Sequence, residues 1–430
     1  MLAALALQAC PADAETFGEV LGRMAQGHPR IVAAQQLSRG GRADVSAARS
    51  AYRPQVGVET NAGWQTVGGN SGFTVLPEAK VSQLVFDGGR TPAEIRRRKL
   101  RVDLLGVQEQ SVLAEISFQL AQAWIDYARA SDLAFVSWQQ VSALQTLDKL
   151  VVEIAQYDRG RASDVVMVES RLQQAVTTQQ TREISLAEAR ARIREISALP
   201  VEPTGGIPDI AAFLPRNAED AQGLVPVSPA VRIADLEVAE NAETVRGTKN
   251  WWMPSLALEG ARTSDISSQG DTRLFNAFAF RLNASMVPFD SGGGRSRHES
   301  AKATLESARS NAELTRVSLG EQARRLWIFQ AQRTERLPSM QNLVDRADEA
   351  REVVFEQFRI GRRSILDLLS YDLERFNVRA QLINERYDIA QTQYQLMGVL
   401  GRIYPAVVEG DGGEGVEGKP LPSGTQGPQP

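Results

Sequence analysis

The chain has 430 residues, 23% of them charged, and a formal net charge of −4. This weakly acidic balance offers no basic surface for nucleic acid, so composition argues against a nucleic-acid partner. One cysteine and two histidines are too few for a zinc site or a Cys/His or Ser/His catalytic unit, and no phosphate-binding glycine loop occurs. We therefore expect no cofactor and no enzyme activity.

The chain opens with an apolar run that ends in Ala12-Asp13-Ala14, a small-x-small pattern that precedes signal peptidase cleavage. We expect residues 1–14 to be a signal peptide and the protein to be exported. An alternative interpretation treats Leu7 to Cys10 as a lipoprotein box with Cys10 acylated, although Gln8 fits it poorly. No later run of 18 or more apolar residues occurs, so no transmembrane helix is expected.

The remaining chain is a tandem duplication. Pro54 and Gly160 of a first repeat, residues 15–203, correspond to Pro254 and Gly361 of a second repeat, residues 228–404, at offsets of about 200. The connection between them, residues 204–227, is rich in Pro and Gly and indicates a linker. Residues 405–430 are rich in Gly, Pro and Glu, so we expect a disordered tail.

Each repeat begins with a helix and a proline and continues with two stretches that look like strands. Small or polar residues alternate there with Val56, Val58, Thr60, Ala62 and Trp64, and later with Phe278, Phe280, Leu282, Ala284 and Met286. Each stretch is about ten residues long, enough to span a bilayer when tilted, but a soluble sandwich shows the same alternation. Four strands cannot close a barrel, so in lipid several copies would have to share one.

A Phe-Asp-Gly motif follows the strands of both repeats, where a strand passes into a helix. Its residues are Phe86, Asp87, Gly88 and Gly89 in the first repeat and Phe289, Asp290, Gly293 and Gly294 in the second. We expect the glycines to permit the backbone turn and the aspartate to cap the following helix.

Long helices follow each motif. No proline lies between Pro92 and Pro200, and apolar residues from Val112 to Tyr127 recur every three or four positions. Gly160 should interrupt this tract and Ser163-Asp164 should cap the next helix, which predicts two antiparallel helices, the first from about Arg90 to Tyr157.

The second repeat predicts the same hairpin. Pro338 is expected to kink or break its first helix. An apolar stripe from Ile365 to Tyr394 predicts its second helix.

The duplicated plan, the segment from Leu84 to Arg90 ahead of a long helix, and the segment from Gly361 to Leu369 together resemble the TolC family of outer-membrane efflux and type I secretion channel proteins. The resemblance implies a mainly α fold. Long antiparallel helical hairpins would form a duplicated α-helical barrel, and four β-strands per chain would contribute to a shared, trimeric, twelve-stranded outer-membrane β-barrel. It also implies the outer membrane of a Gram-negative bacterium, with a periplasmic helical tunnel.

The same resemblance implies a gate at the periplasmic tip, where the helices turn. Asp367 matches a family aspartate at the pore constriction, Arg363 matches an arginine of the closing links, and Asp164 matches an aspartate of the first hairpin. The alternative interpretation is that these charges are helix caps and solvated surface pairs.

A passive, gated exit duct is therefore the predicted function. The implied partners are two further copies of the chain, outer-membrane lipid, a periplasmic adaptor and an inner-membrane ABC transporter. The last helix favours type I secretion of a protein, and the alternative is the outer-membrane component of a small-molecule efflux pump of the RND type. A periplasmic coiled-coil adaptor or scaffold is an alternative of another class, but such a protein needs no alternating strands of bilayer length.

Overall fold

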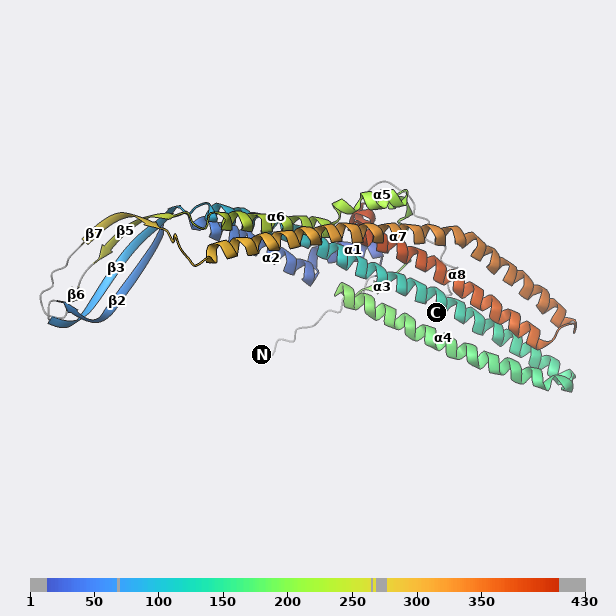
Figure 1. Ribbon diagram of the computed structural model, residues 1–430. Coiled ribbons are helices and arrows are strands. Elements are labelled where there is room, and N and C mark those ends of the chain that lie inside the picture. Colours follow the sequence, from blue (N-terminus) through green and yellow to red (C-terminus); the bar gives the residue numbers. More distant parts are fainter. Residues whose placement is uncertain (1–13, 68–69, 264–265, 268–276, 410–430) are drawn as a thin grey trace, which may run out of the picture. The chain divides into compact units, whose positions relative to one another are not determined.

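The structure, a computed structural model, describes residues 14–67, 70–263, 266–267 and 277–409 (Figure 1). Cys10, almost all of the predicted signal peptide and the tail after residue 409 lie outside the described residues. The chain divides into two compact units. The strand unit comprises residues 33–109 and 229–317, and the tip unit comprises the rest.

The strand unit contains one antiparallel sheet. Its strands are β2 (Gln55–Val67), β3 (Asn70–Phe86), β5 (Ser255–Thr263) and β7 (Ala277–Ser285), with the two-residue β6 (Ile266–Ser267) against β3. The order is β2-β3-β5-β7, so the strand pairs of the two repeats meet where β3 pairs with β5 (Figure 1). Each outer strand, β2 and β7, has one edge with no partner among the described strands.

The predicted apolar alternation lies on the surface of this sheet. Val58 and Trp64 of β2 are 80% and 78% exposed, and Phe280 of β7 is 75% exposed. The side chain of Phe278 lies outside the described residues. Exposed apolar side chains of this size are typical of a face that meets lipid or another protein.

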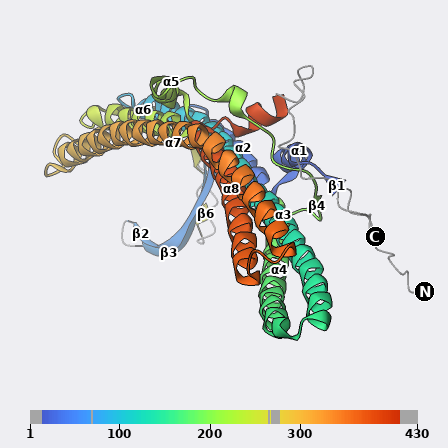
Figure 2. The ribbon, with the colours of Figure 1, turned by 90° about the vertical axis from the view of Figure 1, so that its right-hand side faces the viewer.

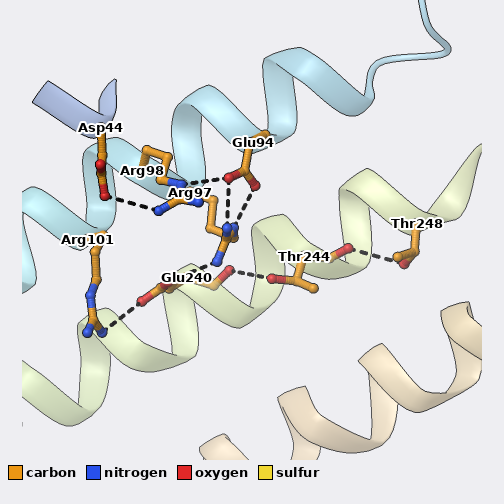
Figure 3. A network of polar contacts seen from close by, with 8 residues as sticks. All are labelled: Asp44, Glu94, Arg97, Arg98, Arg101, Glu240, Thr244 and Thr248. Atoms are coloured by element: carbon orange, nitrogen blue, oxygen red, sulfur yellow. Dashed lines mark hydrogen bonds and ion pairs between the residues drawn. The ribbon is translucent and has the colours of Figure 1, made fainter. Parts of the chain in front are cut away.

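Four helical segments of the strand unit lie beside one another in the same order as the strands. They belong to α2 (Pro29–Ser50), α3 (Arg90–Tyr157), α6 (Pro229–Lys249) and α7 (Gly293–Arg359). Ion pairs join the first three of them (Figure 3). Arg98 of α3 binds Asp44 of α2 at 3.2 Å, and Arg97 of α3 binds Glu240 of α6 at 3.3 Å.

The centre of that network is Glu94, which accepts hydrogen bonds of 2.7 Å from Arg97 and Arg98 (Figure 3). The bond from Arg97 is the largest influence and lowers the pKa of the Glu94 carboxyl, although burial opposes it. Contacts between α6 and α7 complete the series: Thr248 bonds His298 at 3.1 Å, and Asp235 pairs with Arg316. The helix order is therefore α2-α3-α6-α7.

The tip unit contains the two helical hairpins. Its helices are α1 (Phe17–Gly27), the later part of α3, α4 (Ala162–Ser197), the later part of α7 and α8 (Ile365–Leu400). The predicted first long helix, from about Arg90 to Tyr157, is confirmed by α3. The predicted last helix is confirmed by α8.

The core of the tip unit forms where α1 packs against α3 and α8. Trp124 and Tyr394 each meet the Phe17 ring edge-on, with ring centroids 5.7 and 6.0 Å away. Ile116 and Leu120 of the predicted stripe are fully buried in this cluster. The stripe therefore faces the core, as its periodicity predicts.

Pro338 does not break α7, which continues on both sides of it. Of the two expected outcomes, a kink or a break, the break does not occur. The residue is exposed, so water can bond the carbonyl that proline leaves without its usual donor.

The linker and the tail also contain more structure than their composition predicts. The linker holds η2 (Ala211–Phe213), α5 (Ala218–Gly223) and η3 (Val225–Val227). Trp327 donates to the carbonyl of Pro215 at 2.9 Å, and Tyr394 donates to that of Pro208 at 3.0 Å. Disorder from residue 405 was a wrong prediction for residues 405–409, which form the π-helical turn η4 with two buried side chains.

Candidate functional site

The first candidate site is the joint between β3 and α3. The Asp87 carboxylate is buried and accepts from the backbone N–H groups of Gly89 at 3.2 Å and Thr91 at 2.6 Å. This confirms the predicted cap, because these donors have no partner within the helix.

Gly88 and Gly89 have φ angles of +73° and +90°, a conformation that favours glycine. A Cβ at Gly88 would lie 2.8 Å from the Cβ of Met253. Phe86, the last residue of β3, is 40% exposed. The glycine turn is thus required both by the backbone and by close packing.

At the second joint, between β7 and α7, an aspartate again caps the helix, but the backbone turn lies at different positions of the motif. Asp290 accepts from the Gly294 N–H at 2.5 Å and from Arg297 at 3.2 Å. The residues with positive φ are Ser291 and Gly292, at +56° and +88°. Gly293 and Gly294 already belong to α7, so their predicted role as turn residues was wrong.

Packing explains why glycine nevertheless stands at the start of α7. A Cβ at Gly294 would lie only 2.3 Å from the indole ring of Trp251. Phe289, by contrast, is 81% exposed, so it adds nothing to the packing of the described chain. Gly294 therefore lets the start of α7 approach the Trp251 ring closely. The glycine motif in the sequence does not reveal this contact.

The turn between α3 and α4 is the first of two candidate gate elements. Asp158 accepts from the Gly160 N–H at 3.0 Å and shapes the turn. The helix α4 begins at Ala162, and Arg161 occupies the cap position without a side-chain cap bond. The prediction of Ser163-Asp164 as the N-cap was therefore wrong: Asp164 lies in the first turn, where its charge favours the helix dipole.

The turn between α7 and α8 is the second element. Gly361, with φ of +74°, lies just beyond the end of α7. Ser364 caps α8 by accepting from the Asp367 N–H at 3.1 Å, and the Asp367 carboxylate accepts from the Ser364 N–H at 3.3 Å. Arg363 approaches Asp367 at 3.9 Å. Two of the three predicted gate residues therefore lie together, and Asp367 also serves as a cap residue.

The two turns lie at the same end of the tip unit (Figure 2). An apolar cluster holds them together. Phe358 of α7 is 1% exposed and lies in this cluster with Ile365 and Leu368 of α8 and Val168 of α4. The Arg161 guanidinium lies 5.7 Å from the centroid of the Phe358 ring. Asp164 has no ion pair with Arg363 in the described part of the chain.

Sequence reasoning missed Arg161 and Phe358. Arg161 follows Gly160 as Arg362 follows Gly361 in the second repeat, so the internal repeat was a signal that could have found it. Phe358 gave no such signal, because its partner is far away along the chain.

Farther from the turns, arginines of one helix hold acids of the other. Arg351 of α7 binds Asp372 of α8 at 2.8 Å, and both side chains are largely buried. Arg375 and Arg379 of α8 each bind Asp348 of α7 at 2.7 Å. Burial raises the pKa of Asp348, but the bonds from Arg379 and Arg375 outweigh burial and lower it. The α7–α8 hairpin is thus closed by charge pairs.

A groove of about 480 Å³ lies between α3 and α8 in the same unit. Its lining is mostly polar and includes Gln140, Thr146, Arg375 and Arg379, together with the half-exposed Trp138. Trp138 stacks on Phe135, with ring centroids 6.0 Å apart. The groove can accept polar and aromatic side chains of a partner.

Among the described residues, no group of three or more His, Cys, Asp or Glu side chains is placed to hold a metal ion. The described helices also include none with an apolar window long enough to cross a membrane.

Comparison with known proteins identifies the second repeat most directly. Residues 226–402 match the sequence profile of a family described as Outer membrane efflux protein. The Outer membrane efflux protein BepC of Brucella suis is 21% identical over 374 residues, which cover 84% of this chain and 79% of that protein.

Solved structures share the fold over most of the chain. The outer-membrane channel OprN is 17% identical with a TM-score of 0.80, over 90% of this chain and 89% of that one. The outer membrane protein VceC from Vibrio cholerae is 14% identical with a TM-score of 0.77, over 90% of this chain and 96% of that one. At these identities the likeness concerns the fold, which agrees with the predicted fold class.

Proposed function

The chain belongs to the outer membrane efflux protein family, and we propose that it is a trimeric exit duct through which cargo leaves the cell. Family membership locates it in the outer membrane. The duct would do no chemistry of its own, and an inner-membrane pump would supply the energy.

The sheet of the strand unit is the observation that carries this proposal. It has four paired strands, an exposed apolar face and two outer strands, each with an edge that no described strand pairs. Unpaired backbone groups are costly in lipid, so the outer strands need partners. Three copies would supply them by pairing β2 of one copy with β7 of the next, which makes a closed wall of twelve strands.

The hairpin turns of the tip unit are proposed as the gate. Around a threefold axis, three copies of Asp367 would create a negative potential that favours cations. Arg363 and Asp164 would belong to the same ring of charges. The cluster around Phe358 and the Arg161 contact would keep the turns together, and opening would separate the turns of neighbouring copies.

An adaptor from the periplasm is the proposed opening partner. Its helices would dock into the groove between α3 and α8, where Arg375 and Arg379 offer donors and Trp138 offers an aromatic surface. The charge pairs of the α7–α8 hairpin would then move as one rigid element.

Conductance tests the duct and its gate together. The detergent-extracted trimer, placed in a planar bilayer, should conduct ions with a preference for cations. Asp367→Asn should reduce that preference severalfold, because the charge is lost while the amide oxygen can still take the capping bond. Asp345→Asn, an exposed acid elsewhere on α7, is the matched control. A protein that forms no trimer and no conductance would refute the duct.

The cargo class is proposed as a secreted protein, on the resemblance of α8 to members that serve type I secretion. The alternative, a small-molecule cargo, shares the same duct. A deletion strain separates the two: loss of one large secreted protein with normal drug tolerance supports secretion, and drug hypersensitivity with an intact secretome supports small-molecule efflux. A protein found in the soluble periplasm would support the scaffold alternative.

A further inference from the structure

The helices α2, α3 and α6 of the strand unit carry a balanced set of charges on one face. This face holds the network of Figure 3, in which every arginine has an acidic partner. Arg97 and Arg98 bind Glu94, and Arg101 lies 3.6 Å from Glu240. The network contains as many acids as arginines, so it is neutral.

The opposite face of the same three helices is basic. At 3.6 residues per turn, Arg42 of α2 points about 160° away from Asp44, and Arg96 of α3 points about 150° away from the centre of the network residues on α3. Arg246 of α6 likewise points about 160° away from the centre of the network residues on α6. The exposed cations of this basic face are Arg42, Arg49, Arg96, Lys99, Arg246 and Lys249.

The cations of the basic face are poorly neutralised. Arg96 and Arg246 share one acid, the buried Glu243, whose carboxylate lies 2.8 Å from Arg96. The other cations of the face form no ion pair with any residue that the structure describes. The basic face therefore keeps an excess of positive charge, although the formal net charge of the whole chain is −4.

This excess of charge is confined to the helix ends that adjoin the sheet. Lys249 is the last residue of α6, and Lys99 lies nine residues after Arg90, the first residue of α3, so the cations lie within about 14 Å of the sheet ends of their helices. The nearest exposed acids on the same face are Asp103 and Asp235, about 20 Å from those ends. The basic face is thus a band beside the sheet.

Exposed apolar side chains occupy the segments that join the strands to the helices. Trp252, between α6 and β5, is 53% exposed, and Val287 and Phe289, between β7 and α7, are 61% and 81% exposed. Aromatic residues that adjoin cations are typical of the boundary between the hydrocarbon of a membrane and its head groups. If the sheet lies in lipid, the basic band lies at the depth of the head groups.

We propose that the basic face is directed outward from the duct and binds anionic phospholipid head groups of the periplasmic leaflet. Arginine and lysine donate charge-assisted hydrogen bonds to phosphate, and cations beside an anionic leaflet are attracted to it. The neutral network of Figure 3 would then face the passage, where an unpaired basic wall would repel the cations that Asp367 attracts. This inference rests on the proposed duct, and lipid binding would fix the depth of the barrel in the membrane.

Lipid binding by the detergent-extracted trimer tests the basic face. Fluorescent phosphatidylglycerol in mixed micelles should bind more tightly than phosphatidylcholine with the same acyl chains. Loss of the unpaired cations should weaken phosphatidylglycerol binding by roughly tenfold or more, because each cation contributes to the attraction. The variant is Arg42→Gln/Arg49→Gln/Lys99→Gln/Lys249→Gln. Its matched control removes as many exposed cations from the tip unit and should bind like the starting protein; it is Lys149→Gln/Arg216→Gln/Arg324→Gln/Arg325→Gln.

A smaller pair of variants keeps the test decisive if the fourfold variant fails to assemble. Lys99→Gln/Lys249→Gln should weaken phosphatidylglycerol binding severalfold, whereas Lys99→Arg/Lys249→Arg should keep it, because the arginines retain the charge. Inorganic phosphate at the concentration of the lipid should not displace it. Displacement by phosphate would show a site for a free anion and would overturn the lipid surface.

Two further results would overturn the lipid site and leave the duct standing. One is equal binding of both lipids by the starting protein. The other is a stronger cation preference in the conductance of the fourfold variant with unchanged phosphatidylglycerol binding, because the cations would then line the passage. A starting protein that forms no trimer and no conductance would overturn the duct itself.

Discussion

Single residues decide how closely the helices approach the joints. Gly88 and Gly294 are both surrounded by packed atoms, yet only Gly88 has positive φ. The two glycines are therefore needed for different reasons, one for the backbone turn and the other for contact with Trp251.

Gly294→Ala is expected to destabilise the strand unit by about 1–3 kcal/mol, because the new methyl group overlaps the Trp251 ring. The apparent Tm of the detergent-extracted protein measures the change. Gly106→Ala, in α3 with no atom within 4 Å of the added Cβ, is the control and should leave Tm equal or higher. Equal behaviour of the two variants would contradict the packing role.

Elements of the tip unit are held by charge as well as by apolar packing. Asp348 binds two arginines of α8, while Arg351 reaches across in the other direction to Asp372. The α7–α8 hairpin should therefore respond to pH.

The pKa of Asp348 is lower in the folded protein than its ordinary value of 3.8. The ionised Asp348 carboxylate therefore stabilises the fold fully above about pH 4. This stabilisation is lost as the pH falls through the pKa that Asp348 has in the folded protein. Asp348→Asn should lower the free energy of unfolding at pH 7 by less than about 1 kcal/mol, since a third of the side chain is exposed to screening solvent. A lower Tm at pH 7 measures this loss. This difference from the starting protein should disappear in strong acid. Asp345→Asn should show no such pH-dependent difference.

At the scale of the whole molecule, the exposed strand face must meet lipid if the duct is correct. Phe280→Arg places a charge about halfway along this face and should cost about 2–4 kcal/mol in the bilayer. Phe213→Arg, in the linker, replaces a half-exposed phenylalanine that needs no lipid. The fraction of protein assembled in the outer membrane should fall for the first variant only. Equal loss for both would argue that the sheet lies in water.

Sequence reasoning correctly identified the elements because their signals are local. The long helix from Arg90 to Tyr157 follows from periodicity and the absence of proline, and the caps at Asp87 and Asp290 follow from residue type and place. The prediction for Pro338, a kink or a break, left open what the structure decided, because solvation of a freed carbonyl does not appear in a sequence pattern. The cap at Ser163-Asp164 was wrong, because the geometry of a tight turn does not appear there either.

What the sequence by itself determined is the duplicated order of strands, joints and hairpins, since turn chemistry and apolar spacing act between residues that are near in the chain. Only the tertiary structure decided that β3 pairs with β5, that Arg161 lies beside Phe358, and that α2 and α7 form opposite edges of the strand unit. These contacts join residues that are far apart along the chain. Side-chain packing determines which of these residues meet, and no single segment of the sequence encodes that packing.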